Sequence, residues 1–286
     1  MTIRDHLVAA RTRLVAAGIH PAEASLDAGL LARDVLGWDR ATLLVREDEP
    51  PTLEFIERFC ARIERRERRE PVAYIRGVQE FWGRDFIVSP AVLIPRPETE
   101  LIVEDTLQLP GLDKLPSRIC DIGTGSGCLA VTLAAELPNS RIVATDTSPG
   151  ALQVARANAE RHRVAGRIEF REGEYLAGAT DPFHVIVSNP PYVSEEDYAT
   201  LAPEVHDHEP ASALVAGADG LHDIREILDL AATALMPGGV LLMEIGFDQA
   251  DVIPLRVGAL PRLTLMGISR DLQGLARVAV VQRRMS

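Results

Sequence analysis

The residues best suited to chemistry follow a short apolar run, 183–188, and form the tetrapeptide Asn189-Pro190-Pro191-Tyr192. The side-chain carbonyl of Asn189 and the main-chain carbonyl of Pro190 are both acceptors, and proline has no N–H to compete for them. A residue that precedes proline is pushed toward extended backbone, so both carbonyls should be held in place before a substrate arrives. Tyr192 adds a flat face for stacking. The pattern indicates recognition of a planar NH2 group and suits its methylation.

A glycine-rich turn separates a strand-like segment, 118–120, from a helical run, 128–135, and reads Asp121-Ile122-Gly123-Thr124-Gly125-Ser126-Gly127. Glycines allow close approach of the backbone to a ligand and positive φ, and a helix start offers free N–H groups. A dinucleotide site of the form G-x-G-x-x-G/A needs a small residue where Cys128 stands. Nicotinamide binding is therefore the weaker interpretation of this turn.

An acidic residue ends the second predicted strand, 141–146, nineteen positions after Gly127. Asp146 can accept hydrogen bonds from both hydroxyls of a ribose, which fits any adenosine-containing cofactor. Because a helix is predicted from about Gly150, Asp146 also suits a helix N-terminal acid or cap. The spacing from the glycines favours the ribose role.

Together, these three features resemble the S-adenosylmethionine-dependent amino-methyltransferases. More narrowly, the chain is similar to the release-factor glutamine methyltransferase family, known as PrmC or HemK. The narrower resemblance covers nearly the whole chain, most firmly from about 71 to 246. It also rests on Phe81-Trp82-Gly83, Leu93-Ile94-Pro95-Arg96-Pro97-Glu98-Thr99-Glu100, and Glu209-Pro210 with Ala213-Leu214.

The resemblance implies methyl transfer from S-adenosyl-L-methionine to the side-chain amide nitrogen of the glutamine in the Gly-Gly-Gln loop of class-1 peptide-chain release factors. Asn189, which would also border the cofactor, would accept a hydrogen bond from that amide with help from the Pro190 carbonyl. Pro191 and Tyr192 would shape the slot, and Asp146 would hold the ribose. The methionine and sugar portion of the cofactor would lie against Gly123, Thr124, Gly125, Ser126 and Gly127.

One stretch departs from the family pattern. After the third predicted strand, 167–171, relatives commonly carry an acid followed by an aromatic residue at the adenine edge. Here Gly173 replaces the acid and Glu174 replaces the aromatic residue. We expect Glu174, or else Glu172, to reach the adenine amino group, and the alternative is an exposed acidic turn.

The predicted elements divide the chain into residues 1–80, 81–96 and 97–286. Helices expected over 21–36, from Asp39 through Val45, and from Pro51 to about Arg69 predict a small N-terminal helical bundle. The alternating segment 81–95 predicts a β-hairpin linker. From Thr99 onward, helices alternate with strands, as in a doubly wound, mostly parallel α/β sheet. The resemblance implies a seven-stranded methyltransferase sheet whose antiparallel edge is formed by 263–269 and 277–282.

Composition limits the classes of partner. The chain has 286 residues, of which 47% are hydrophobic, and this allows a large core in one or two domains. Through Arg96 there are fifteen arginines and fifteen acids, so all twelve net negative charges lie in the remainder. Because duplex nucleic acid is bound through basic surface, a DNA adenine-N6 methyltransferase is disfavoured. An adenine-N6 nucleic-acid methyltransferase, a glutamine methyltransferase of a ribosomal protein and a non-catalytic cofactor-binding module remain as alternatives.

Cysteine usage and hydropathy bear on location. Three cysteines, without a C-x-x-C pair, disfavour a disulfide framework and a zinc cluster and suit a reducing compartment. Asp5 places an acidic residue where a secretory signal would have an apolar segment. No apolar run reaches the about 20 residues that span a bilayer. We expect a cytoplasmic monomer without membrane contact.

Several charged residues have ordinary structural explanations. Arginines and glutamates interleaved over 58–69 favour a solvated helical face over a partner-binding patch. Two imidazoles in His206-Asp207-His208-Glu209 rarely bind one ion without further ligands, so no metal is expected. Glu244, at the end of the fifth strand, is either a support for the Asn189 loop or a buried, paired carboxylate. Arg96 and Glu98 line the cofactor entrance or, as we favour, form a hinge.

Overall fold

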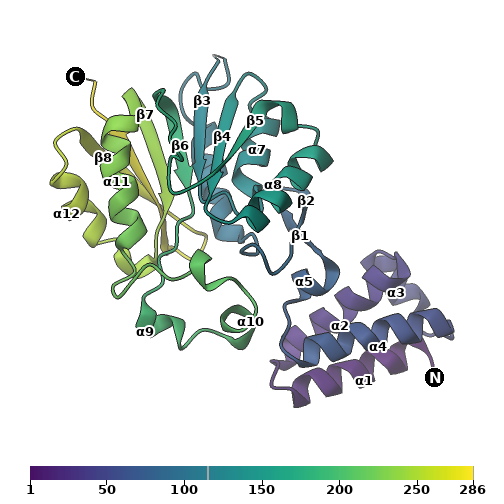
Figure 1. Ribbon diagram of the computed structural model, residues 1–286. Coiled ribbons are helices and arrows are strands. Elements are labelled where there is room, and N and C mark those ends of the chain that lie inside the picture. The colour runs from purple at the N-terminus through teal and green to yellow at the C-terminus, as the bar shows by residue number, and fades with distance from the viewer. Residues whose placement is uncertain (115, 286) are drawn as a thin grey trace. The chain divides into compact units, whose positions relative to one another are not determined.

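The computed structural model describes residues 1–114 and 116–285 (Figure 1). They form two compact units, each described here by itself. The first unit consists of Met1–Val78 with Ala202–His208, and the second of Gln79–Leu201 with the chain from Glu209 onward. Within the described residues, no helix combines the length and the apolar character needed to cross a membrane.

The first unit is a helical bundle, as predicted. Its helices are α1 (Ile3–Ala16), α2 (Pro21–Leu36), α3 (Arg40–Arg46), α4 (Leu53–Glu67), α5 (Val72–Arg76) and α10 (Pro203–His206). The side chains of Thr2, Asp39 and Thr52 accept backbone N–H bonds at three helix starts, and Gly37 ends α2 in the left-handed conformation. Apolar side chains from α1, α2 and α4 form the core of this unit.

The expectation of a solvated arginine face is wrong for Arg66, whose side chain is buried. Its guanidinium contacts Asp27 at 2.7 Å, Glu23 at 2.8 Å and Glu204 at 2.7 Å. A buried charge requires such partners, and they come from segments that a helical charge pattern does not reveal. Glu204 belongs to the 202–208 segment, and its ion pairs with Arg66 and Arg69 explain why that segment joins the bundle.

A β-hairpin follows the bundle, but it lies earlier than the predicted 81–95. Its strands are β1 (Val78–Phe81) and β2 (Arg84–Ile87), and residues 88–96 form neither helix nor strand. The two turn residues, Trp82 and Gly83, have φ of 53° and 68°. Positive φ at both positions matches the twist of a two-residue hairpin turn, whereas the sequence pattern gave no reason to expect it at a tryptophan.

The second unit contains the predicted seven-stranded sheet. Its strands are β3 (Arg118–Ile122), β4 (Arg141–Asp146), β5 (Ile168–Glu172), β6 (Phe183–Ser188), β7 (Leu235–Glu244), β8 (Leu263–Arg270) and β9 (Ala276–Arg283). They follow the order β5-β4-β3-β6-β7-β9-β8. The first five are parallel to one another, and β9 pairs antiparallel with both β7 and β8. The predicted antiparallel edge is thus confirmed.

Helices cover both faces of this sheet (Figure 1). The first buried cluster joins one face to α6 (Glu100–Leu107), α7 (Cys128–Glu136) and α8 (Pro149–Arg161). The second joins the other face to α11 (His222–Ala234) and α12 (Val252–Gly258). The short helices η1 (Pro97–Thr99) and α9 (Glu195–Tyr198) lie in connecting segments.

Strand register aligns the carboxyl ends of four parallel strands. Ile122 of β3 lies opposite Thr145 of β4 and Ser188 of β6, and Ser188 lies opposite Met243 of β7. Ligands of open α/β sheets bind at this edge, where the strand order reverses between β3 and β6. The residues that follow these four positions therefore share one row at the edge: Gly123, Asp146, Asn189 and Glu244.

A buried asparagine ties the hairpin to the glycine turn. Asn158 of α8 accepts a hydrogen bond from the Ile87 N–H at 2.7 Å and donates to the Ile87 carbonyl at 2.9 Å. It also donates to the Ser126 carbonyl at 2.8 Å. One side chain thus satisfies three backbone groups, two in the hairpin and one in the turn.

Replacing Asn158 tests the contribution of these three hydrogen bonds to stability. Asn158→Ala leaves the three backbone groups without that partner, so we expect a loss of about 2–4 kcal/mol in unfolding free energy. Urea denaturation measures the loss. Gln153→Ala, at an exposed position of the same helix, is the control and should change stability by less than about 0.5 kcal/mol. Equal effects of the two variants would contradict the assignment.

Candidate active site

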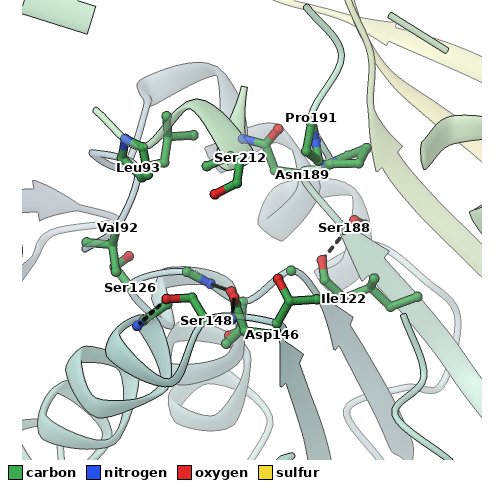
Figure 2. Close-up of a pocket in the computed structure, with 18 of the residues that line it drawn as sticks. Val92, Leu93, Ile122, Ser126, Asp146, Ser148, Ser188, Asn189, Pro191 and Ser212 are labelled. Carbon is green, nitrogen blue, oxygen red and sulfur yellow. Dashed lines mark hydrogen bonds between the residues drawn. The ribbon is translucent and has the colours of Figure 1, made fainter. Parts of the chain in front are cut away.

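A cavity of about 330 Å³ lies at the carboxyl edge of the sheet. Figure 2 shows Asn189, Pro191 and Ser212 across the open space from Asp146 and Ser148. The structure brings together nine residues predicted from the sequence, Gly123, Thr124, Gly125, Ser126, Asp146, Glu174, Asn189, Pro190 and Pro191. Of the other predicted site residues, Gly127 and Tyr192 are not part of the cavity wall, and neither is Glu172.

The glycine turn has the conformation that its composition predicts. Gly123 and Gly125 have φ of 69° and 54°, which favour glycine, and both border the cavity. Gly127, with φ of 80°, has a different task. A β-carbon there would lie 3.1 Å from that of Ala155, so this glycine allows α7 to pack closely on α8.

Asp146 is held at the cavity wall by two backbone N–H groups, and the N-cap of α8 is Ser148. Its Oδ1 accepts a hydrogen bond from the Ser148 N–H at 2.8 Å, just before α8 begins. Its Oδ2 accepts from the Gly125 N–H at 2.9 Å. Each carboxylate oxygen can accept a further bond, and the residue borders the cavity. The carboxylate is therefore fixed by the turn and is still able to accept hydroxyl groups.

A second carboxylate, Asp121, is buried below the turn. Its Oδ2 accepts from the Thr124 hydroxyl at 2.6 Å and from the Ala130 N–H at 3.1 Å. Its Oδ1 has no hydrogen-bond partner within the described part of the chain. Burial raises the pKa of Asp121 to about 7, and the nearby charge of Asp146 adds to the rise.

Asn189 is held by a chain of hydrogen bonds. Its Nδ2 donates to the Thr99 hydroxyl at 3.0 Å, and that hydroxyl donates to Oε2 of Glu244 at 2.6 Å. The Tyr192 hydroxyl donates to Oε1 of Glu244 at 3.2 Å. Glu244 thus both supports the Asn189 loop and is a buried, hydrogen-bonded carboxylate, and burial raises its pKa to about 7. Thr99 lies in the segment 93–100, which carries part of the family resemblance, but the sequence pattern gives no role to Thr99 itself.

Glu209 holds another part of the cavity wall in place. Its Oε2 accepts from the Ile94 N–H at 3.0 Å, and its Oε1 pairs with Arg96, which borders the cavity. Arg96 therefore has a share in the cavity wall beyond the hinge role favoured for it, whereas Glu98 lies outside that wall.

The histidines before Glu209 have other contacts. His206 Nδ1 lies 2.6 Å from Asp207 Oδ1, and His208 Nε2 lies 3.2 Å from the Arg68 carbonyl. Across residues 1–114 and 116–285, no group of three or more potential metal-binding side chains occurs.

The chain is similar to known families and to solved structures with the same fold. The chain matches the PrmC N-terminal domain family over residues 5–77 and the methyltransferase small domain family over residues 100–208. The structure is similar to the hMettl16 catalytic domain solved with a MAT2A 3′ UTR hairpin, at a TM-score of 0.56 and 17% identity over 91% of each chain. It is also similar to a methyltransferase from Pyrococcus furiosus, at a TM-score of 0.51 and 19% identity over 79% of this chain and 97% of that one. The second unit therefore has a methyltransferase fold.

Closer relatives identify the family. The release factor glutamine methyltransferase of Geobacter sulfurreducens is 42% identical over 88% of this chain and 87% of its own. That of Cereibacter sphaeroides is 42% identical over 97% of each chain. The chain belongs to the release factor glutamine methyltransferase family.

The raised pKa of Asp121 predicts a pH dependence of stability. In the cofactor-free folded protein Asp121 keeps its proton up to about pH 7, whereas in the unfolded chain it ionises near 3.8. Between these values the folded state binds more protons, so the unfolding free energy falls as pH rises. Asp121→Asn cannot ionise and should show a smaller fall. Urea denaturation at intervals from about pH 4 to about pH 8 measures both slopes, and parallel curves would contradict the prediction.

Proposed function

We propose that this protein transfers a methyl group from S-adenosyl-L-methionine to the side-chain amide nitrogen of the glutamine in the Gly-Gly-Gln loop of class-1 peptide-chain release factors. The observation that carries the proposal is 42% identity to the release factor glutamine methyltransferase of Cereibacter sphaeroides over 97% of each chain. The cavity supports it, since Asn189 lies across the open space from Asp146 (Figure 2), and the glycine turn borders the same cavity.

The described residues fit the cofactor. Positive-φ glycines at 123 and 125 leave no β-carbon between the backbone and a ligand, and Asp146 retains acceptor capacity toward ribose hydroxyls. Glu174 borders the same cavity and can accept from an adenine amino group. When bound, S-adenosylmethionine supplies an activated methyl group on a sulfonium centre.

The side chain of Asn189 and the carbonyl of Pro190 then act on the substrate amide. An amide nitrogen is a poor nucleophile because its lone pair is delocalised into the carbonyl. Two acceptors that fix both N–H directions favour a more pyramidal nitrogen whose lone pair faces the methyl group. Positive charge develops on that nitrogen during transfer, so carbonyl dipoles aimed at it stabilise the transition state. Orientation of the reacting groups contributes at best roughly 7–11 kcal/mol.

The setting of the reaction follows from the substrate. Because release factors act in translation, we place the protein in the cytoplasm. We also propose that the protein acts as a monomer. The surplus of acids after Arg96 supports a protein substrate over duplex nucleic acid.

Asn189→Ala tests the proposed function. Loss of the acceptor should lower turnover on a purified release factor by about 100-fold or more, while the melting temperature changes little. Mass spectrometry of the Gly-Gly-Gln peptide after incubation with the cofactor measures methylation. Asn139→Ala, at an exposed position, is the matched control and should retain full activity. DNA, RNA and a release factor with glutamate in place of the glutamine serve as comparison substrates, and methylation of nucleic acid alone would refute the proposal.

Two neighbouring acids test the adenine contact. Glu174→Ala removes a carboxylate that borders the cavity and should weaken cofactor binding about three- to tenfold, as expected for one hydrogen bond. Glu172→Ala, whose side chain lies outside the cavity wall, should leave the affinity within about twofold. Isothermal titration calorimetry measures both. An unchanged affinity in Glu174→Ala would remove this residue from the cofactor site.

A further inference from the structure

The proposed reaction needs the oxygen, not the nitrogen, of the Asn189 carboxamide to face the substrate. An asparagine side chain has nearly the same shape in both orientations, so shape alone does not select between them. A substrate NH2 group that met the Asn189 NH2 group would face a donor instead of an acceptor. Some other group must therefore decide which end of the carboxamide points into the cavity.

The donors and acceptors along the hydrogen-bond chain determine which end of the Asn189 carboxamide points into the cavity. An ionised carboxylate only accepts, so Glu244 requires a proton from each of its two hydroxyl partners. The single proton of the Thr99 hydroxyl is then committed to Glu244, at 2.6 Å. Toward Asn189, Thr99 can offer only a lone pair, and the group that meets it must be the NH2 group, at 3.0 Å.

We propose that Thr99 and Glu244 are positioning residues that orient the Asn189 carboxamide with its oxygen toward the substrate, through the contacts Asn189 to Thr99 to Glu244, with Tyr192 as the second donor to Glu244. The inference rests on the proposed function, since it assigns a task to the acceptor used there. Thr99 and Glu244 are 2% and 1% exposed, so water does not compete for their hydrogen bonds.

Protonation of Glu244 releases this constraint. A protonated carboxyl group can donate to the Thr99 oxygen, which frees the Thr99 proton for the oxygen of Asn189 and allows the reversed orientation. The pKa of Glu244 is raised to about 7. Burial is the main cause of the rise, the hydrogen bonds from Thr99 and Tyr192 oppose it, the charge of Glu98 adds to it and the charge of Arg277 opposes it. The ionised form is the active one, so kcat/KM should fall as pH drops below about 7.

Two substitutions of Thr99 separate orientation from packing. Thr99→Val keeps the shape but removes the hydroxyl, and we expect kcat/KM for the release factor to fall about 10- to 100-fold at pH 8. Thr99→Ser keeps the hydroxyl and should stay within about threefold of wild type. Cofactor affinity and melting temperature, measured for both, report on the fold. The decline below about pH 7 should persist in Thr99→Ser and be lost in Thr99→Val.

Tyr192→Phe tests the same chain without altering Thr99. Loss of the hydroxyl removes a hydrogen bond that lowers the pKa of Glu244, so the acidic decline in kcat/KM should move to higher pH. This variant decides the question if Thr99→Val does not fold. A decline that stays in place would overturn the inference.

The outcomes distinguish this inference from the proposed function. If wild type does not methylate the release factor, the function itself fails. If wild type methylates it and Thr99→Val matches Thr99→Ser in both rate and pH profile, the function stands and the orienting role is wrong.

Discussion

The common register of β3, β4, β6 and β7 at their carboxyl ends is the constraint on which the site depends. Parallel pairing fixes each strand against its neighbours, and a slip of one residue would move a strand end by about 3.3 Å and turn its side chains to the opposite face. The glycine turn, Asp146, Asn189 and Glu244 come from distant parts of the chain, yet each begins one residue after the aligned positions Ile122, Thr145, Ser188 and Met243. The sheet therefore sets the spacing of the acceptors before any ligand enters.

Two buried carboxylates beneath this edge show that the site is arranged at some cost to stability. Asp121 supports the start of α7, and Glu244 supports Asn189, and burial raises the pKa of both to about 7. Among the residues that the structure describes, neither has a salt-bridge partner, and their hydrogen bonds come from hydroxyl and backbone donors. Such groups favour a defined geometry over maximal stability, as is common where polar side chains must be held in one orientation.

The sequence predicted those parts of the structure that are governed by local chemistry. The glycine turn, Asp146 and Asn189 were identifiable because strand ends, turns and X-Pro bonds have characteristic residues close together in the chain. Thr99 was not identifiable, because its partners lie 90 and 145 positions away. Arg66 was misjudged for the same reason, since its acidic partners come from α2 and from the 202–208 segment. The roles of the cavity residues themselves remain predictions.

Glu209 is the residue at which the chain re-enters the second unit, and it also holds part of the cavity wall. The chain leaves the second unit after Leu201, contributes 202–208 to the bundle and rejoins at a carboxylate that holds both the Ile94 N–H and Arg96. Because Glu209 holds both groups, we expect a change of length in the excursion to leave this part of the wall in place. The excursion thus begins and ends outside the cavity wall, and its own ion pairs, from Glu204 to Arg66 and Arg69, belong to the bundle.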